Sequence, residues 1–284
     1  MAGNQKAIKQ RIKSVQSTKQ ICKAMELVAA SRMHKATERA QNSKPYFESM
    51  QNTLAQIARK NTSLYSPYVK GNGSESWCYI LIAGDRGFAG GYNNNLFHLV
   101  EQEMEGKDCM VFPIGKKSYD RYSGRSVPII SDSFMIAQDI SVSDCFEIAR
   151  IVCSAYRKGA FGHLTVAYTK FVNMMTQEPE LIPLLPLPEM AVLNDEEIGH
   201  NRILYEPSAE TVFDTVVPEY LAGLIYGALS SSVASELAAR RMMMDAATKN
   251  AEEMIDKLNL HYNRVRQAGI TQEITEIVAG ADAG

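Results

Sequence analysis

Residues 77–91 read WCYILIAGDRGFAGG, in which seven apolar residues are followed by a glycine-rich turn. An uninterrupted apolar run of this length is typical of a strand that is buried on both faces of a sheet. Residues 93–105, directly after the turn, have the spacing of a helix. The order strand, turn and helix predicts an α/β sheet whose first strand begins at Trp77.

Further strands and helices alternate along the chain after this segment. The sequence predicts strands at 109–114, 127–130 and 164–169 and a helix at 141–158. Such alternation favours a mainly parallel sheet with helices on both faces, which is a three-layer, Rossmann-like α/β domain. Residues 181–188 contain too many prolines for a central strand, so we expect an edge or wrapping segment there.

The residues before this domain predict one long helix. Apolar or small side chains recur every three or four positions from Ile8 to Ala36, which is the spacing of one helical face. Pro45 is the only proline before residue 60, and no glycine lies between Gly3 and Gly71, so the helix can extend from about residue 4 to the high fifties. At 1.5 Å per residue it is roughly 80 Å long. Such a helix must pack along another long helix or inside a partner.

The end of the chain predicts the second long helix. Ser208 can cap it, and Pro218 either bends it or marks its start. Small and apolar residues then recur at steps of four and three, as in a coiled coil: Leu224, Ala228, Ser231, Ser235, Ala238 and Met242. Because a folded domain separates the two helices, we expect them to form an antiparallel coiled coil. The predicted parts are a helix at 1–60, the α/β domain at 61–206 and a helix at 207–284.

Charge is divided unevenly between these three parts. Residues 1–60 hold 12 Lys and Arg against 3 Asp and Glu, a net charge of +9. The other parts are acidic, because 12 against 18 give −6 at 61–206 and 6 against 11 give −5 at 207–284. A basic coiled coil can bind nucleic acid by releasing counterions, and this stays an alternative function. The basic helix has almost no aromatic residues for base stacking, which favours an acidic protein partner or cavity instead.

Composition and spacing argue against several classes of protein. The 284 residues are 45% hydrophobic and 22% charged, which is typical of a globular protein and unlike a collagen, a disordered chain or a disulfide scaffold. Five cysteines form no C-x-x-C pair and five histidines stand far apart, so we expect neither a metal site nor a cofactor. The apolar runs are far shorter than the roughly 20 residues of a membrane span, and we expect no secretory signal.

The glycine-rich turn at 84–91 has the composition of a phosphate-binding loop but not its pattern. It lacks the lysine of a P-loop, and Asp85 and Arg86 interrupt the G-x-G-x-x-G spacing. Residues 115–118, GKKS, do not complete a P-loop either, since no glycine stands five residues earlier. We therefore expect a tight turn in which Asp85 pairs with Arg86. No G-x-S-x-G elbow or Ser/His/Asp set indicates that the chain itself is a catalyst.

Three groups of residues carry a resemblance to a known family. They are VQST at 15–18 with KAMELVAASRM at 23–33, DRGFAGG at 85–91, and ITQEITEI at 270–277. In these motifs and in their separations, over essentially the whole chain, the sequence strongly resembles the gamma subunit of the bacterial F-type ATP synthase. The resemblance implies the same architecture that the residues alone predict, a long antiparallel coiled coil with a central α/β domain.

The resemblance also implies a function and a set of partners. The gamma subunit of that family is a central rotor shaft. It couples ion flow through the membrane ring to ATP synthesis or hydrolysis at the beta subunits, and it has a role in regulating ATPase activity and proton flow. Three alpha and three beta subunits would surround the coiled coil, the epsilon subunit and the c ring would lie at the foot, and delta would belong to the same complex. The chain would be a non-catalytic, peripheral subunit on the cytoplasmic face of the cell membrane.

Positions that match the family's functional residues are the candidate sites. By resemblance, the contacts with the catalytic head fall on Met25, Arg240, Gln272, Thr275 and Glu276. Tyr205 and Glu206 match the foot that meets the membrane ring. The resemblance implies no catalytic, cofactor-binding or metal-binding residue in this chain.

Overall fold

The computed structural model describes residues 2–60, 66–134, 136–187 and 205–282. Contacts within the chain divide it into two compact units. The two-helix unit comprises Met1–Ala30 and Arg240–Gly284, and the sheet unit comprises Ser31–Ala239. Helices α1 (Ala2–Lys60) and α6 (Ala209–Asp282) contribute residues to both units.

Helices α1 and α6 are the long terminal helices that the sequence predicts. α1 is continuous through Pro45, and α6 is continuous through Pro218. The start of α6 is capped by Ser208, whose Oγ accepts a hydrogen bond of 3.2 Å from the backbone N–H of Thr211. Pro218 therefore does not mark the start of the helix, because a capped turn already precedes it.

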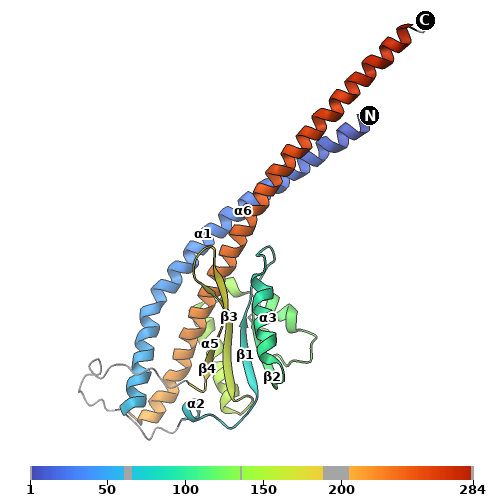
Figure 1. Cartoon of the computed structure of the whole chain (residues 1–284). Coiled ribbons are helices and arrows are strands. Elements are labelled where there is room, and N and C mark those ends of the chain that lie inside the picture. The colour runs from blue at the N-terminus through green and yellow to red at the C-terminus, as the bar shows by residue number, and fades with distance from the viewer. Residues whose placement is uncertain (1, 61–65, 135, 188–204, 283–284) are drawn as a thin grey trace. The chain divides into compact units, whose positions relative to one another are not determined.

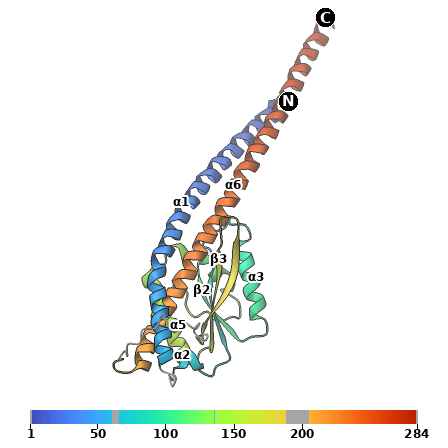
Figure 2. The same ribbon diagram turned by 60° about the vertical axis from the view of Figure 1, so that its left-hand side comes forward.

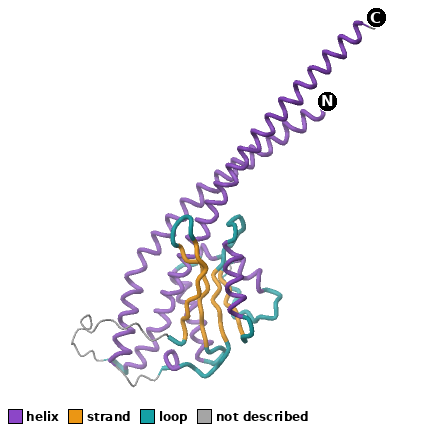
Figure 3. The backbone as a smooth tube through the Cα atoms, viewed as in Figure 1, coloured by secondary structure: helices purple, strands orange, loops and turns teal. Residues whose placement is uncertain are grey.

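The sheet unit is built on four strands in the order β2-β1-β3-β4. The strands are drawn in orange in Figure 3. They are β1 (Trp77–Ile82), β2 (Cys109–Ile114), β3 (His163–Phe171) and β4 (Gln177–Leu185). β1 lies parallel to both β2 and β3, whereas β4 runs antiparallel to β3. The proline-rich segment thus contributes to an edge strand, as expected, since an edge tolerates residues without an N–H group.

Residues 127–130 do not form the predicted strand. Ile129 makes only an isolated bridge with Val111 of β2. The Val111 N–H donates to the carbonyl of Pro128 at 2.9 Å, and the Ile130 N–H donates to the carbonyl of Val111 at 3.0 Å. The ladder does not extend on either side because Pro128 and Pro113 of β2 have no N–H group to donate.

Helices α3 (Tyr92–Met104) and α5 (Val142–Arg157) lie within one residue of their predicted bounds. Sequence analysis did not identify α2 (Pro67–Lys70), α4 (Lys116–Tyr122) and the 3-10 helix η1 (Ala137–Asp139), because such short elements show no clear periodicity. α5 begins with a capping box, in which the Ser141 N–H donates to the Asp144 carboxylate at 2.7 Å and the Asp144 N–H donates to Ser141 Oγ at 3.3 Å.

Two apolar clusters hold helices against opposite faces of the sheet, because successive strand side chains point to opposite faces. Ile80 and Ile82 of β1 belong to the cluster that includes α5, α6 and the end of α1, whereas Leu81 belongs to the cluster with α3 and α4. Ile57 of α1 and Phe213 of α6 are fully buried in the first cluster, where the two helices lie side by side (Figures 1 and 2). The predicted three-layer α/β arrangement is confirmed.

One stretch of α6 has the hydropathy of a membrane span. Within Ala209–Ala279, an 18-residue window reaches a mean hydropathy of 1.2, but 78% of that window is buried inside the protein. The buried apolar side chains of α6 from Phe213 to Leu229 belong to the cluster that covers the sheet. Its hydropathy therefore follows from its place in the core.

Candidate functional site

The two-helix unit pairs the start of α1 with the second half of α6 in opposite directions. Lys19 Nζ lies 2.8 Å from a carboxylate oxygen of Glu252. Nearer the N-terminus, a Cβ atom added to Gly269 would lie 3.2 Å from Nε2 of Gln5. Residues nearer the start of α1 thus face residues nearer the end of α6. The antiparallel pairing predicted from the sequence is confirmed in this unit.

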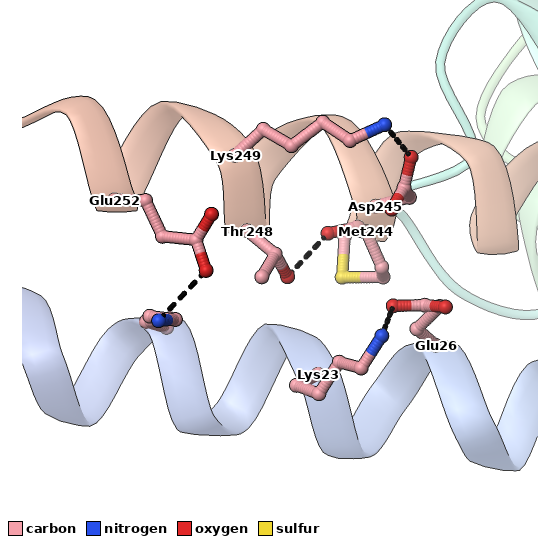
Figure 4. Close-up of polar contacts among 8 residues, drawn as sticks. Lys23, Glu26, Met244, Asp245, Thr248, Lys249 and Glu252 are labelled. Carbon is pink, nitrogen blue, oxygen red and sulfur yellow. Dashed lines mark hydrogen bonds and ion pairs between the residues drawn. The ribbon is translucent and has the colours of Figure 1, made fainter.

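The interface of this unit is made mainly of small or flexible side chains. The buried residues are Ile8 and Ala29 of α1 and Arg240, Met244, Thr248, Ala251 and Gly269 of α6. Thr248 is polar, but its hydroxyl donates to the carbonyl of Met244 in its own helix at 2.8 Å (Figure 4). The contact between the helices therefore rests mostly on apolar packing, which has little directional preference.

Two ion pairs of this unit each join neighbouring residues of a single helix, one on α1 and one on α6. Lys23 is 2.9 Å from Glu26 on α1, and Lys249 is 2.7 Å from Asp245 on α6 (Figure 4). The hydrogen bond from Lys249 lowers the pKa of Asp245 below its ordinary value. One pair joins the two helices, Lys19 with Glu252, and its side chains are 36% and 51% exposed. Exposed pairs of this kind contribute about 0–1 kcal/mol, so this pair adds little to the stability of the unit.

The start of α1 presents a row of cations to solvent. Lys6, Lys9 and Lys13 are exposed, and with Asn259 and Tyr262 of α6 they line a groove of about 890 Å³. Their spacing of three and four residues places them on one face of the helix. No carboxylate is among the described side chains that line the groove. This face therefore favours a partner with negative charge.

The structure places the five candidate head contacts in the two-helix unit. Met25 is half-buried on α1, and Arg240 is buried on α6. Gln272, Thr275 and Glu276 are exposed on α6. Gln272 Nε2 donates to Glu276 Oε1 at 2.8 Å, and the Thr275 hydroxyl donates to the carbonyl one turn earlier at 2.8 Å. The structure thus brings the last three residues together on one stretch of α6.

The same end of α6 exposes large apolar side chains. Ile270, Ile274, Ile277 and Val278 are 49 to 71% exposed. Gly269, directly before this stretch, lies close to Gln5 of α1. Exposed apolar residues at helical spacing are typical of a surface that contacts another protein.

The two candidate ring contacts belong to the sheet unit. Tyr205 is half-buried and packs against the larger apolar cluster, whereas Glu206 is exposed. The bond from Glu206 to Pro207 is cis, and Ser208, the cap of α6, follows directly. The segment is therefore anchored by one aromatic ring and presents one carboxylate to solvent.

The glycine-rich turn is held differently from the prediction. The Asp85 carboxylate accepts hydrogen bonds from the backbone N–H groups of Ala137 at 2.7 Å and Gln138 at 3.2 Å, and Arg86 is exposed. Burial raises the pKa of Asp85, and the two N–H donors oppose that effect. The predicted Asp85–Arg86 pair is wrong, because the half-buried carboxylate binds backbone donors that the fold brings to it.

The GKKS segment also serves the fold. The Ser118 hydroxyl donates to the carbonyls of Ile114 at 2.7 Å and Gly115 at 2.6 Å, and the Lys117 N–H donates to the carbonyl of Gly84 at 3.0 Å. These bonds close the start of α4 onto the ends of β1 and β2. Within residues 2–60, 66–134, 136–187 and 205–282, no three or more His, Cys, Asp and Glu side chains gather as a metal ion would require.

Sequence analysis did not identify one polar cluster of the sheet unit. The side-chain amide of Gln138 donates to Glu236 Oε2 at 2.9 Å and accepts a hydrogen bond of 2.9 Å from Arg32. Glu236 is only 1% exposed. The available signal was the single acidic residue in the otherwise small and apolar segment ALSSSVASELAA at 228–239.

Comparisons with known proteins agree on one family. The family model described as ATP synthase matches residues 4–283. A relative from Ruminococcus albus, an ATP synthase gamma chain, is 43% identical over 279 residues that cover 96% of each chain. A relative from Acetobacterium woodii, a sodium-ion-specific ATP synthase gamma chain, is 38% identical and covers 100% of this chain and 99% of its own.

Solved structures share the fold. A chain in the cryo-EM structure of the Euglena gracilis mitochondrial ATP synthase matches with a TM-score of 0.68 and 18% identity, over 100% of this chain and 95% of that one. A chain of the central stalk and c-ring structure from Tetrahymena thermophila matches with a TM-score of 0.60 and 22% identity, over 80% and 99%. With the sequence relatives, these findings show that the chain belongs to the ATP synthase gamma chain family.

Proposed function

We propose that this gamma chain works as the central rotor shaft of an F-type ATP synthase. In this proposal, the two-helix unit turns inside a head of three alpha and three beta subunits. Tyr205 and Glu206 meet the c ring beside the epsilon subunit, and delta belongs to the same complex. ATP is made or hydrolysed on beta, and this chain supplies no catalytic group. It is a peripheral protein on the cytoplasmic face of the cell membrane.

The observation that carries the proposal is the construction of the two-helix unit within a chain that belongs to this family. Its helices pack mainly through apolar side chains such as Ile8, Ala29 and Met244, and the end of α6 presents an exposed apolar face at Ile270, Ile274 and Ile277. A shaft needs such an exposed face, because apolar contacts hold it in a sleeve without directional bonds that would resist rotation. The comparisons give no support to the nucleic-acid-binding alternative.

The asymmetry of this unit suits it to drive other subunits through different states. Lys6, Lys9 and Lys13 lie on one face of α1, so only one side of the shaft presents this cationic row. A rotating shaft can change the conformation of a beta subunit only if it contacts that subunit differently at each angle. The head contacts proposed at Met25, Arg240 and Gln272–Glu276 would supply such differential contacts, and through them the shaft would influence ATPase activity and proton flow.

The first experiment asks whether the chain assembles as proposed. The tagged chain is purified from its own cells in mild detergent, and its partners are identified by mass spectrometry. We expect alpha and beta in threefold excess over this chain, together with ATPase activity. Recovery of the chain alone, or bound to nucleic acid, would refute the proposal.

A matched pair of substitutions then tests coupling. Met25→Lys adds a cation at a half-buried position of the two-helix unit, whereas Met175→Lys makes the same change at a position that is 80% exposed in the sheet unit. In reconstituted vesicles we expect fewer ions pumped per ATP for Met25→Lys, with normal assembly, and a wild-type ratio for Met175→Lys. Equal ratios in both variants would contradict the assigned contact at Met25.

A further inference from the structure

The carboxyl ends of the two central strands, β1 and β3, are where a fold of this class would hold a ligand. The chain crosses from β1 to β2 on one side and then returns to β3 on the other side of β1. In open α/β sheets, ligands bind at the carboxyl ends of the strands, at the point where the strand order reverses. Here that point lies beside Ile82 of β1 and Thr169 of β3.

Serine side chains of α6 occupy this place. The Ser232 hydroxyl donates to the carbonyl of Ile82 at 3.2 Å, and the Ser235 hydroxyl donates to the carbonyl of Thr169 at 3.0 Å. Ser231 Oγ accepts a hydrogen bond of 2.8 Å from the N–H of Phe171 at the end of β3. Ser232 and Ser235 are buried. These hydroxyls satisfy strand-end groups that a bound ligand or water would otherwise meet.

The carboxylate of Glu236, on the same helix, lies against Gly84 at the start of the glycine-rich turn. A Cβ atom added to Gly84 would lie 2.6 Å from Glu236 Oε1, so only glycine lets the carboxylate approach this closely. A carboxylate of the protein itself thus lies against the glycine-rich turn, where the phosphate of a ligand would lie in a dinucleotide-binding protein. The contact with Glu236 accounts for the glycine at position 84.

Gln138 extends the contact from α6 to the other long helix. Its amide bridges Glu236 of α6 and Arg32 of α1, with hydrogen bonds of 2.9 Å to each. Its backbone N–H is held by Asp85, in the turn after β1, at 3.2 Å. One residue of η1 therefore connects α1, α6 and the end of β1.

We propose that these strand ends serve as a mechanical joint. In this joint, Gln138 and Glu236 hold both long helices on the α/β domain, so that the helices and the domain turn together. The inference rests on the proposed rotor function. Apolar packing resists separation of a helix from a sheet, but it has little preference for one sliding position over another. Hydrogen bonds weaken steeply when they are misaligned, so bonds to a buried carboxylate resist the sideways displacement that torque produces.

The test measures how stiffly the domain follows the shaft. The complete complex is fixed to a surface through its head, and a bead is attached to a cysteine that replaces the exposed Lys158 of the sheet unit. The width of the bead's angular distribution during pauses between steps reports the torsional stiffness. We expect Gln138→Leu to raise the angular variance at least about twofold at an unchanged rate of ATP turnover, because it removes both hydrogen bonds of the amide.

Two further variants make the result specific. Gln138→Asn keeps the amide but shortens it by one methylene, so it should also widen the distribution even where Gln138→Leu fails to assemble. Gln102→Leu removes an exposed amide whose hydrogen bond, 3.2 Å long, joins it to His98 of the same helix, and it should leave the width unchanged. A merely structural role for Gln138 would lower assembly or turnover without changing the width.

The outcomes separate the joint from the rotor function. If the bead on the wild-type complex turns, and both Gln138 variants show the same angular width as the wild type, the joint alone is overturned. A wild-type bead that never turns under ATP would overturn the proposed function and the joint with it.

Discussion

Replacing Gly115 by alanine tests how tightly the ends of β1 and β2 pack, and Gly124 supplies a matched control. The two glycines flank α4 and have φ angles of +88° and +86°. A Cβ atom at Gly115 would lie 2.2 Å from the carbonyl oxygen of Ala83 and 3.0 Å from its carbon. A Cβ atom at Gly124 would meet nothing within 4 Å. The two positions thus share a positive φ, but Gly115 also has a ψ of 147°, close to a conformation that essentially only glycine adopts, and only its Cβ atom would clash.

The magnitudes follow from these two terms. A left-handed backbone costs an alanine about 1–2 kcal/mol, and the loss of glycine's freedom in the unfolded chain offsets about 0.4–1 kcal/mol of that. Gly124→Ala should therefore destabilise the sheet unit by about 0–1.6 kcal/mol. Gly115→Ala should cost a further amount of about 1–3 kcal/mol, because its ψ of 147° disfavours alanine and because the atom that the methyl group meets is backbone and cannot rotate away.

Hydrogen exchange in the assembled complex can measure the difference. Peptides that cover β1 and β2 should exchange about 10- to 100-fold faster in Gly115→Ala than in Gly124→Ala, since about 1.4 kcal/mol changes an opening equilibrium tenfold. Equal exchange in the two variants would refute the reasoning. It would mean that the strand ends relax around a methyl group at no cost and that the contact with Ala83 carries no constraint.

Three smaller effects follow from single contacts. Lys19→Ala should lower the free energy of unfolding in urea by less than about 1 kcal/mol, and less still at high salt, because its pair with Glu252 is exposed. Hydrogen bonds from Arg121 lower the pKa of Glu101, so their contribution to stability is present at neutral pH and is lost as the pH falls through the acid range. Urea unfolding from about pH 6 to pH 3 should therefore show a shallower decline for Arg121→Leu than for the wild type. Burial raises the pKa of Cys145 to about 12, so mass spectrometry should find it alkylated at neutral pH only after unfolding.

The sheet could be predicted where apolar runs are short, buried and bounded by turns. Residues 77–83 and 109–114 meet these conditions, and both form strands close to the predicted bounds. Residues 127–130 look similar by composition, but Pro128, together with Pro113 of β2, limits the ladder to two hydrogen bonds. Periodicity and composition describe side chains, whereas a strand also requires backbone donors in sequence.

The candidate sites were much less predictable from residues alone. The spacing of Ser231 and Ser235 correctly indicates a covered face of α6, and it suggests a coiled-coil partner. In the structure these two hydroxyls bond to the backbone of β3 instead. A periodic pattern shows that a face is covered but not by which element. The head contacts at Gln272 and Glu276 came from the resemblance alone, because exposed polar residues follow no pattern that packing imposes.

Two neighbouring stretches of α6 make different kinds of contact, and the change falls within a few residues. From Ser231 to Glu236, the helix is bound to the sheet unit by directional hydrogen bonds to β1, β3 and η1. From Met244 to Ala251, its buried side chains meet α1 mainly through apolar packing. A hydrogen bond holds a helix in one position, whereas apolar packing keeps nearly the same energy over many positions of the helix. The hydrogen bonds therefore fix the register of α6 on the sheet, whereas the apolar packing holds α6 and α1 together with little directional preference.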